Sequence, residues 1–360
     1  MKEFSSKRFR IASAAAITAL LSSAPVLQSQ SASPLSSTSP LYREVIDETG
    51  RTVRVPQPVN RIVSLAPSLT ETVYALGLQD HLVGDTEYCD FPPDAQKKTR
   101  VGGGINPSLE IIASLHPDIV LVTKAFNRLE TVSSLESLGI SSYATDPHTV
   151  DEIIASSKKL SDILGAPEAG SSVAGDLQRR LADLEHHLGA LPPKRVLFVV
   201  WTQPLISVGK NTFIADALHR AGAVSIVDSD QDWPQVSLEE VAHLQPDFLV
   251  FADSHSDSSS SNVDALATLP GWSIVQAVSK RHFAVVSDAV NRPAPRIVSA
   301  IEELARQLHP DAFVEKPENN KEKIEKENPA PKERPTPQPS FSSNPLQTIT
   351  LFHGGCACAH

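Results

Sequence analysis

Two cysteines and two histidines lie close together at the end of this chain, in the sequence HGGCACAH (353–360). Thiolate and imidazole groups bind soft metal ions such as Cu(I) or Zn(II), so Cys356, Cys358 and His360 are candidate metal ligands. The Cys-x-Cys pair could instead form a strained disulfide. Because the spacing fits no standard zinc motif, we expect no resident metal ion.

Residue types that perform catalysis are not arranged in a known pattern. The chain has no Gly-x-Ser-x-Gly elbow, no Walker loop and no Gly-x-Gly-x-x-Gly after a predicted strand. Its other histidines are scattered, and the run EHH at 185–187 falls on the solvated face of a predicted helix. We therefore expect neither an enzyme nor a protein that binds a bare transition-metal ion.

The length, composition and charge of the chain indicate its general class and limit the kinds of molecule that it can bind. A chain of 360 residues has room for about two domains at roughly 100–200 residues each. Apolar residues make up 41% and charged residues 21%, as in an ordinary globular protein. The formal charge of −10 argues against nucleic acid, because phosphate binding needs a basic face.

One stretch of sequence occurs twice. SLEIIASLHPDIVLV (108–122) and SLEEVAHLQPDFLVF (237–251) share Ser, Leu, Glu, Ala, Leu, Pro and Asp at equivalent positions. The offset is too long for a solenoid repeat, and it indicates two similar lobes. In each copy we expect the Ser to cap a helix, the Pro to end it and the following apolar run to form a strand.

Alternating helices and strands predict two α/β lobes with mainly parallel sheets. A hairpin turning at Gly50 precedes a strand at 61–67 and a helix at 68–78, in which Ser68 is the predicted N-cap and Glu71 completes a capping box. The remaining elements of the first lobe are strands near 82–84, 118–122 and 140–144 and helices at 108–115 and 128–138. The second lobe has strands at Lys194–Val200, 247–251 and 283–286 and helices at 211–221, 237–244, 263–269 and 295–308.

Two helical segments connect these lobes. Residues 151–165 and 168–189 are amphipathic, and a continuous second helix would be roughly 30 Å long. Such a helix predicts a stiff connection with small movement of the lobes.

The two ends of the chain differ from the rest. Basic residues followed by the short apolar run Ile11–Leu21 predict a secretory signal peptide over residues 1–33, and no cysteine follows that could carry a lipid. We therefore expect a soluble periplasmic protein.

Residues 310–360 mix both charge signs with many prolines, which predicts a disordered tail. The predicted domains are an N-terminal lobe at 34–150, a connecting helical segment at 151–190 and a C-terminal lobe at 191–309.

Five stretches of the chain resemble, in order, the cobalamin-binding proteins of bacterial ABC importers: RIVSLAPSLTETVYALGL, EYCDFPPDAQKKTRVGG, PSLEIIASLHPDIVLV, WPQVSLEEVAHLQPD and NRPAPRIVSAIEEL. The resemblance covers about residues 42–308. It implies a class III periplasmic binding protein, in which a single long α-helix joins two Rossmann-like lobes and the ligand lies in the cleft between them. It also implies a monomer that delivers cobalamin or a related corrinoid to an ABC permease with its ATPase subunits, and that meets the membrane only through this permease.

The resemblance also implies roles for two residues of the repeated stretch. Glu110 and Glu239 match the glutamates, one in each lobe, that pair with arginine side chains of the permease. A carboxylate in the first turn of a helix also complements the helix dipole, which contributes ~0.3–1 kcal/mol. The two roles are compatible.

Five residues are candidates for binding the ligand. Tyr88 matches a ligand-contacting aromatic residue of the family, and Asp288 and Arg292 match a polar pair that faces the cleft. Trp201 and Trp233 follow predicted strands, where open α/β sheets bind ligands. Each has a structural alternative, since Trp201 could belong to the core, Trp233 could pack its own loop and Arg292 could be a surface residue paired with Asp288. Corrinoids are large, flat and partly apolar, so they suit aromatic walls with a few hydrogen-bonding groups.

One departure from the family concerns the ligand. The best-known cobalamin binders carry a tryptophan before the first repeated stretch, whereas this chain has VGGGINP at 101–107. Glycines allow a close approach of the backbone but provide no aromatic wall. Haem or a ferric siderophore therefore stays open as an alternative ligand, and an exported α/β enzyme or a signalling sensor stays open as an alternative class.

Overall fold

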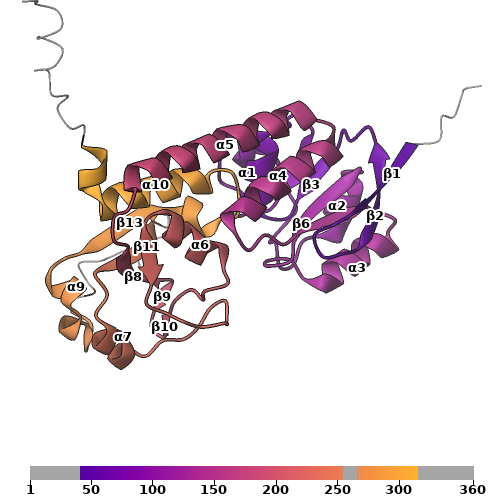
Figure 1. Ribbon diagram of the computed structural model, residues 1–360. Coiled ribbons are helices and arrows are strands. Elements are labelled where there is room, and N and C mark those ends of the chain that lie inside the picture. The colour runs from indigo at the N-terminus through magenta and orange to yellow at the C-terminus, as the bar shows by residue number, and fades with distance from the viewer. Residues whose placement is uncertain (1–40, 254–265, 267, 315–360) are drawn as a thin grey trace, which may run out of the picture. The chain divides into compact units, whose positions relative to one another are not determined.

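The computed structural model describes residues 41–253, 266 and 268–314 (Figure 1). These residues divide into two compact units. The first unit comprises the described residues up to Pro147 together with Ala155–Val173, and the second comprises His148–Ile154 and the described residues from Ala174 onward. The predicted signal peptide lies outside the described residues. No helix within the described ranges is both long and apolar enough to cross a membrane.

The first unit contains a five-stranded parallel sheet in the order β5-β4-β3-β6-β7. Its strands are β3 (Ile62–Ser64), β4 (Leu82–Asp85), β5 (Thr99–Arg100), β6 (Ile119–Thr123) and β7 (Ser142–Thr145). Helices α1 (Pro67–Ala75), α2 (Leu109–Ser114) and α3 (Leu129–Ser137) and the 3-10 helix η1 (Pro93–Lys97) lie between them in the chain. The predicted hairpin is confirmed as β1 (Leu41–Ile46) and β2 (Thr52–Gln57), with Gly50 at a φ of 87° in its turn.

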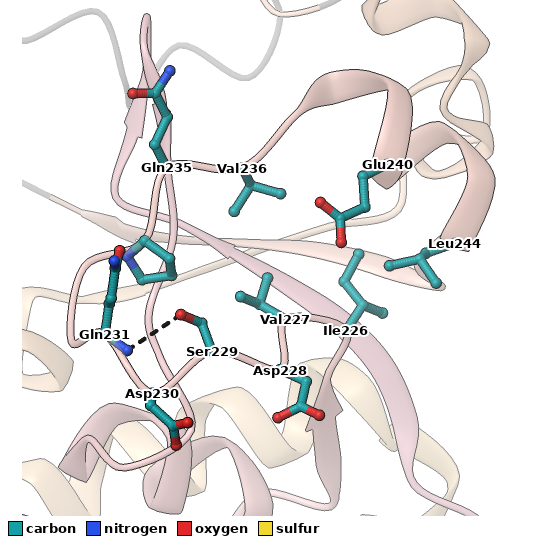
Figure 2. Close-up of a pocket in the computed structure, with 11 residues that line it drawn as sticks. Ile226, Val227, Asp228, Ser229, Asp230, Gln231, Gln235, Val236, Glu240 and Leu244 are labelled. Carbon is teal, nitrogen blue, oxygen red and sulfur yellow. Dashed lines mark hydrogen bonds between the residues drawn. The ribbon is translucent and has the colours of Figure 1, made fainter.

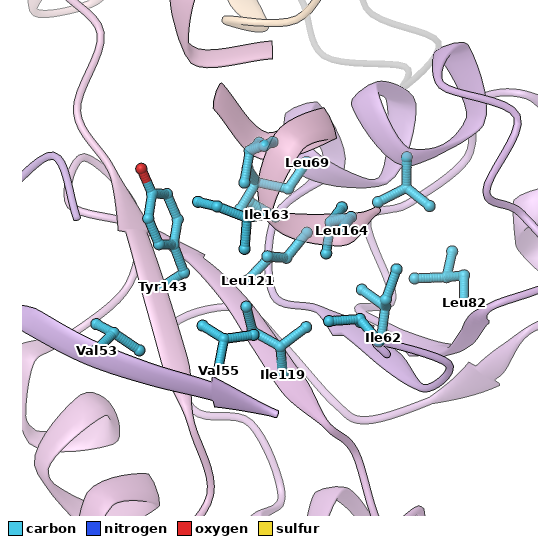
Figure 3. Close-up of a cluster of buried hydrophobic side chains, with 14 residues drawn as sticks. Val53, Val55, Ile62, Leu69, Leu82, Ile119, Leu121, Tyr143, Ile163 and Leu164 are labelled. Carbon is cyan, nitrogen blue, oxygen red and sulfur yellow. The ribbon is translucent and has the colours of Figure 1, made fainter. Parts of the chain in front are cut away.

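The sheet of the first unit is buried on both faces. Ile119 and Leu121 of β6 belong to the cluster of buried side chains drawn in Figure 3, which also includes residues of β2, β3 and α1. Val120 and Val122, the alternate residues of the same strand, pack instead with side chains of α2 and α3. A parallel sheet covered on both faces needs apolar residues at every position, which explains the continuous apolar runs in the sequence.

The second unit contains a four-stranded parallel sheet in the order β11-β8-β12-β13. Its strands are β8 (Lys194–Val199), β11 (Ala223–Ser225), β12 (Phe248–Asp253) and β13 (Phe283–Ser287), and its larger helices are α6 (Phe213–Arg220), α7 (Leu238–Leu244) and α10 (Ile297–Leu308). The same arrangement occurs in strands β4-β3-β6-β7 of the first unit. In both sets of four, the strand that comes first in the chain lies between the second and the third. The predicted α/β class with two similar lobes is therefore confirmed.

Helix α10 covers the free edge of strand β13 with its side chains. Gln307 accepts a hydrogen bond from the backbone nitrogen of Val285 at 3.0 Å and donates one to the oxygen of the same residue at 2.8 Å. Glu303 accepts a hydrogen bond from the backbone nitrogen of Ser287 at 3.0 Å. These side chains satisfy backbone groups that a neighbouring strand would otherwise pair.

The repeated stretch begins with the same helix cap in both units. Ser108 Oγ accepts a hydrogen bond from the backbone nitrogen of Ile111 at 3.3 Å. Ser237 Oγ accepts hydrogen bonds from the backbone nitrogens of Glu239 and Glu240 at 3.2 and 3.4 Å. Both predicted N-caps are confirmed, and each satisfies a donor that the first turn of a helix leaves unpaired.

The aspartate of the repeated stretch also has one role in both units. Asp118 Oδ2 accepts a hydrogen bond from the backbone nitrogen of Arg61 at 2.9 Å, next to the start of β3. Asp247 Oδ2 accepts the equivalent bond from Arg195, within β8, at 2.8 Å. The repeated sequence therefore has a structural role, because each copy links a helix and two adjacent strands in the same way.

Helix α5 (Pro167–Leu188) is continuous over 22 residues, as predicted. At 1.5 Å per residue it is about 33 Å long. Its residues up to Val173 belong to the first unit, and those from Ala174 onward belong to the second. The preceding helix, α4 (Val150–Leu164), also contributes residues to both units.

The predicted cap of α1 is wrong. The N-cap is Ala66, two residues before Ser68, with Pro67 in the first turn, and no side chain of the described residues caps the helix. Ser68 is buried within the first turn. Proline has the φ angle of a helix and lacks the N–H that would go unpaired there, so Pro67 starts the helix.

Two of the predicted segments lie partly outside the described residues. The helix predicted at 263–269 falls largely outside them. The predicted disordered tail begins with a short 3-10 helix, η4 (Pro310–Phe313), in which the ring of Phe313 stacks on that of His187 with 5.4 Å between centroids. The prediction of disorder is wrong for these four residues, because an aromatic side chain gives them a surface to pack on. From residue 315 onward the tail lies outside the described residues.

Candidate ligand-binding site

The five predicted ligand-binding residues all follow the carboxyl ends of strands. Tyr88 follows β4, Trp201 follows β8, Trp233 follows β11, and Asp288 and Arg292 follow β13. In an open parallel sheet, ligands bind beyond the carboxyl ends of the strands, where the strand order reverses. This point lies between β3 and β6 in the first unit and between β8 and β12 in the second.

The turn after β4 presents Tyr88 to solvent. The side chain of Tyr88 is 58% exposed, whereas Cys89 beside it is buried. Arg100 holds this turn, because its guanidinium donates hydrogen bonds to the backbone oxygens of Thr86 at 2.6 Å and of Cys89 at 3.1 Å. The same guanidinium donates to Asp85 Oδ1 at 2.7 Å. The conformation around Tyr88 is therefore fixed from beneath by one arginine.

The ionisable groups beneath Tyr88 are buried. Burial raises the pKa of the Asp85 carboxyl to about 6, although Arg100 acts in the opposite direction. Burial also raises the pKa of the Cys89 thiol, which lies 3.1 Å from the hydroxyl of Thr70. A buried thiol in this protonation state is a poor nucleophile, so Cys89 is a structural residue.

Phe126 is an aromatic residue that the sequence analysis missed. It follows β6, and its ring centroid lies 6.3 Å from that of Tyr88 with 79° between the ring planes. The neighbouring residue Asn127 fixes this turn by donating hydrogen bonds to the backbone oxygens of Leu65 and Gly104, both at 2.9 Å. The available signal in the sequence was its place in the loop after a predicted strand.

The two tryptophans belong to one small antiparallel structure. Trp201 pairs with Ile206 in the hairpin of β9 (Trp201–Thr202) and β10 (Leu205–Ile206), and Ile206 pairs in turn with Gln235, two residues after Trp233. Trp201 is 48% exposed and Trp233 is 53% exposed. The alternative that Trp201 belongs to the core is therefore wrong. Its indole nitrogen donates a hydrogen bond to the backbone oxygen of Gln203 at 2.7 Å.

Asp288 lies between two arginines. Its Oδ2 is 2.7 Å from Nη2 of Arg292, and its Oδ1 accepts a hydrogen bond from Nη1 of Arg296 at 3.1 Å. The side chains of Asp288 and Arg292 are only 14% and 15% exposed. The predicted pair is thus present, but the alternative of a solvated surface pair is wrong, because both groups are largely removed from water.

The two predicted docking glutamates occupy equivalent positions. Glu110 is in the first turn of α2 and Glu239 is in the first turn of α7, and both are exposed. Neither carboxylate forms an ion pair within the part of the chain that the structure describes. Their charge is therefore available to a cationic partner.

A small pocket lies in the second unit between the loop after β11 and helix α7 (Figure 2). Figure 2 shows Glu240 and Leu244 projecting from α7 toward this loop. The pocket volume is about 270 Å³. Since pockets for drug-sized ligands are roughly 300–1,000 Å³, this one is too small for a corrinoid.

Side chains that could bind a metal ion do not cluster in the described part of the chain. Among the described residues, no group of three or more His, Cys, Asp or Glu side chains is placed to hold a metal ion. Cys356, Cys358 and His360 lie outside those residues, so their candidacy as metal ligands stays a prediction.

The two similar parallel sheets, the continuous helix α5 and the exposed aromatic residues after the strands define a solute-binding protein of the two-lobed, helix-linked class. Residues 62–289 match the family model described as periplasmic binding protein, and the chain belongs to this family. The relatives described below are named as binding proteins.

Two of the similar proteins are named for vitamin B12. The chain is 33% identical over 259 residues to the vitamin B12-binding protein of Vibrio cholerae serotype O1, covering 70% of this chain and 90% of that protein. The crystal structure of the periplasmic vitamin B12 binding protein BtuF of Vibrio cholerae superimposes with a TM-score of 0.61 at 31% identity, covering 72% of this chain and 99% of that one.

A third relative is named for a different ligand. The periplasmic heme-binding protein RhuT from Roseiflexus sp. RS-1 superimposes with a TM-score of 0.63 at 25% identity, covering 71% of this chain and 99% of that one. The fold is therefore shared by binding proteins for more than one macrocycle.

Proposed function

We propose that this chain is the exported substrate-binding protein of an ABC importer, and that it captures cobalamin or a related corrinoid. The observation that carries the proposal is the set of half-exposed aromatic side chains, Tyr88, Trp201 and Trp233, beyond the carboxyl ends of both sheets. The 33% identity to a vitamin B12-binding protein supports the choice of ligand.

The chemistry of these residues suits a corrinoid. Aromatic rings offer flat apolar surfaces at a low entropic cost, and the largest surface of a corrinoid is its flat ring. Asp288 and Arg292 supply an acceptor and donors for the amide groups around that ring. In this proposal the ligand is carried and not converted, so the protein has no catalytic residue and no catalytic cofactor.

Delivery of the ligand requires a partner. Glu110 and Glu239 dock the loaded protein on the permease, one in each unit, by pairing with its arginine side chains. A monomer presents both glutamates to one permease with its ATPase subunits. Support for this step comes from their exposure, their equivalent positions and the absence of an internal ion pair to either in the described chain.

The test is equilibrium binding of cyanocobalamin to the purified mature chain, followed by tryptophan fluorescence and by calorimetry. We expect saturable one-to-one binding with a submicromolar dissociation constant. The absence of binding by a chain with a normal circular dichroism spectrum would exclude cobalamin as the ligand.

Haem is the second candidate ligand, on two specific observations. The chain superimposes on a heme-binding protein at 25% identity. Tyr88 also carries its phenol on an exposed side chain, and tyrosine oxygen is a known axial ligand of haem iron. The same titration with haemin, followed by the Soret band, decides between the two macrocycles.

A further inference from the structure

The loop after β5 has a glycine at a place where no other residue fits. A Cβ atom on Gly104 would lie 2.0 Å from Cε1 of Phe126 and 2.9 Å from the backbone oxygen of Leu65. Both distances are shorter than a normal contact. A Cβ atom at position 104 would therefore overlap the space that the ring of Phe126 fills. The glycines of this loop therefore do more than make it flexible, because one of them makes room for an aromatic ring from another loop.

The ring of Phe126 is held firmly in that place. Asn127 binds the backbone oxygens of Leu65 and Gly104, which lie on the two segments that Phe126 touches. The ring is partly buried, and one part of it packs against the apolar core of the first unit. A side chain anchored in this way loses little entropy when a ligand contacts its remaining surface.

Phe126 and Tyr88 together form a corner of two rings. Their planes stand at 79°, which is an edge-to-face arrangement and not a stack. A Cβ on Gly103 would lie 3.8 Å from Cε2 of Tyr88, which places the glycine loop beside this ring as well. Phe126 follows β6, at the reversal of strand order where a parallel sheet receives its ligand, and Tyr88 follows β4, on the other side of β3.

We propose that Phe126 is a ligand-contacting residue that determines specificity, and that with Tyr88 it forms the aromatic surface against which the first unit receives a flat macrocycle. In this way Phe126 supplies the wall that the glycines at 102–104 lack. The inference rests on the proposed function for its ligand class, a corrin or porphyrin ring, but it concerns a residue that the resemblance does not assign.

The first experiment compares three variants. Phe126→Leu keeps most of the buried volume but removes the flat ring, and Phe126→Tyr keeps the ring. Phe313→Leu is the matched control, because it removes a partly buried phenylalanine of η4 that is not among the proposed ligand-binding residues. Dissociation constants are measured for cyanocobalamin and, in parallel, for haemin.

We expect Phe126→Leu to raise the dissociation constant of the bound macrocycle about tenfold, since one aromatic contact contributes up to ~1.5 kcal/mol beyond its area. Phe126→Tyr and Phe313→Leu should leave it within about threefold of the wild-type value. An unchanged constant for Phe126→Leu in a folded protein would overturn the inference and leave the proposed function intact.

The two macrocycles separate the two hypotheses. If the wild type binds haemin only, and Phe126→Leu weakens that binding, the corrinoid proposal falls and the role of Phe126 stands. If the wild type binds neither probe, both are overturned.

A double-mutant cycle tests the fit between the glycine and the ring. Gly104→Ala should weaken binding in the wild type because its methyl group displaces the ring of Phe126. In the Phe126→Ala background the same exchange should have a much smaller effect, limited to its contact with Leu65. Strictly additive effects would show that Gly104 and Phe126 act independently, and would contradict the proposed mechanism.

Discussion

Arg100 and Asp85 form an ion pair that satisfies only one oxygen of the carboxylate. Nη1 of Arg100 lies 2.7 Å from Oδ1 of Asp85, and Oδ2 is buried with no hydrogen-bond partner in the described part of the chain. The removal of this carboxylate from water outweighs the attraction of the guanidinium, and its pKa rises from 3.8 to about 6. This pair connects the stability of the first unit to pH.

The first prediction concerns that dependence. Between pH 3.8 and 6 the folded protein keeps a proton on Asp85 that the unfolded chain has released, so the free energy of unfolding falls as the pH rises through this window. The contribution is on the order of 2–3 kcal/mol. Urea unfolding of Asp85→Asn and of wild type should show the variant gaining relative stability between pH 4.5 and pH 7.5. A stability difference equal at both pH values would contradict this prediction.

The second prediction concerns the position of Tyr88. Arg100→Met removes the hydrogen bonds to the turn at Thr86 and Cys89 and leaves Asp85 without its cation. We expect a loss of roughly 3 kcal/mol in the free energy of unfolding and a dissociation constant for the ligand raised severalfold. Arg54→Met is the control, because Arg54 pairs with Glu44 at 3.9 Å on the solvated hairpin and should change stability by less than about 1 kcal/mol. Equal effects of the two substitutions would refute the special role of Arg100.

The third prediction concerns docking. The double variant Glu110→Gln and Glu239→Gln should bind the ligand with wild-type affinity but no longer stimulate uptake by the permease in proteoliposomes. Glu185→Gln, an exposed glutamate of α5, should behave as wild type in both assays. A fall in ligand affinity in the double variant would assign these residues to the binding site or the fold instead.

The fourth prediction uses the phenol of Tyr88 to distinguish the two macrocycles. Tyr88→Phe keeps the aromatic ring and removes the oxygen. If the ligand is a corrinoid, its dissociation constant should stay within about threefold of wild type, since the ring supplies most of the contact. If the ligand is haem bound through Tyr88, the Soret band should shift and the affinity should fall at least tenfold. Titrations of the variant with cyanocobalamin and haemin measure both outcomes.

The fifth prediction concerns the repeated aspartate. Asp118 Oδ2 accepts hydrogen bonds from the backbone nitrogens of Asn60 and Arg61 at 2.8 and 2.9 Å. Asp118→Ala should lower the free energy of unfolding by about 2 kcal/mol, since hydrogen bonds to a charged group each contribute roughly 1.5–3 kcal/mol and these are partly exposed. Asp80→Ala is the control, because Asp80 is exposed and accepts no such bonds from the residues that the structure describes. Thermal unfolding of both variants at the same pH measures the difference.

The features that the sequence predicts well are those that depend on neighbouring residues. Ser108 and Ser237 cap helices because each hydroxyl reaches a backbone nitrogen two or three residues away. The continuous helix α5 follows from the regular spacing of its buried leucines, and β3, β6, β8 and β12 follow from short apolar runs.

The features that the sequence does not reveal depend on contacts between distant segments. Phe126 faces Gly104, which is on a different loop, and nothing near either residue in the sequence indicates that they meet. Trp201 is in a two-residue strand, which is too short to have a hydrophobic period.

At Ser68 two local rules compete, and the restricted geometry of Pro67 prevails over the capping preference of serine.

The side chains of Gln307 and Glu303 on the edge of β13 have a consequence for how this protein behaves at high concentration. A bare edge strand invites pairing with a strand of another molecule, which is a common first step of aggregation. At this edge an incoming strand would have to displace a glutamine that uses both its donor and its acceptor, and then meet a carboxylate. Intermolecular strand addition at β13 is therefore disfavoured, which suits a carrier that must stay dispersed and diffuse between its ligand and its partner.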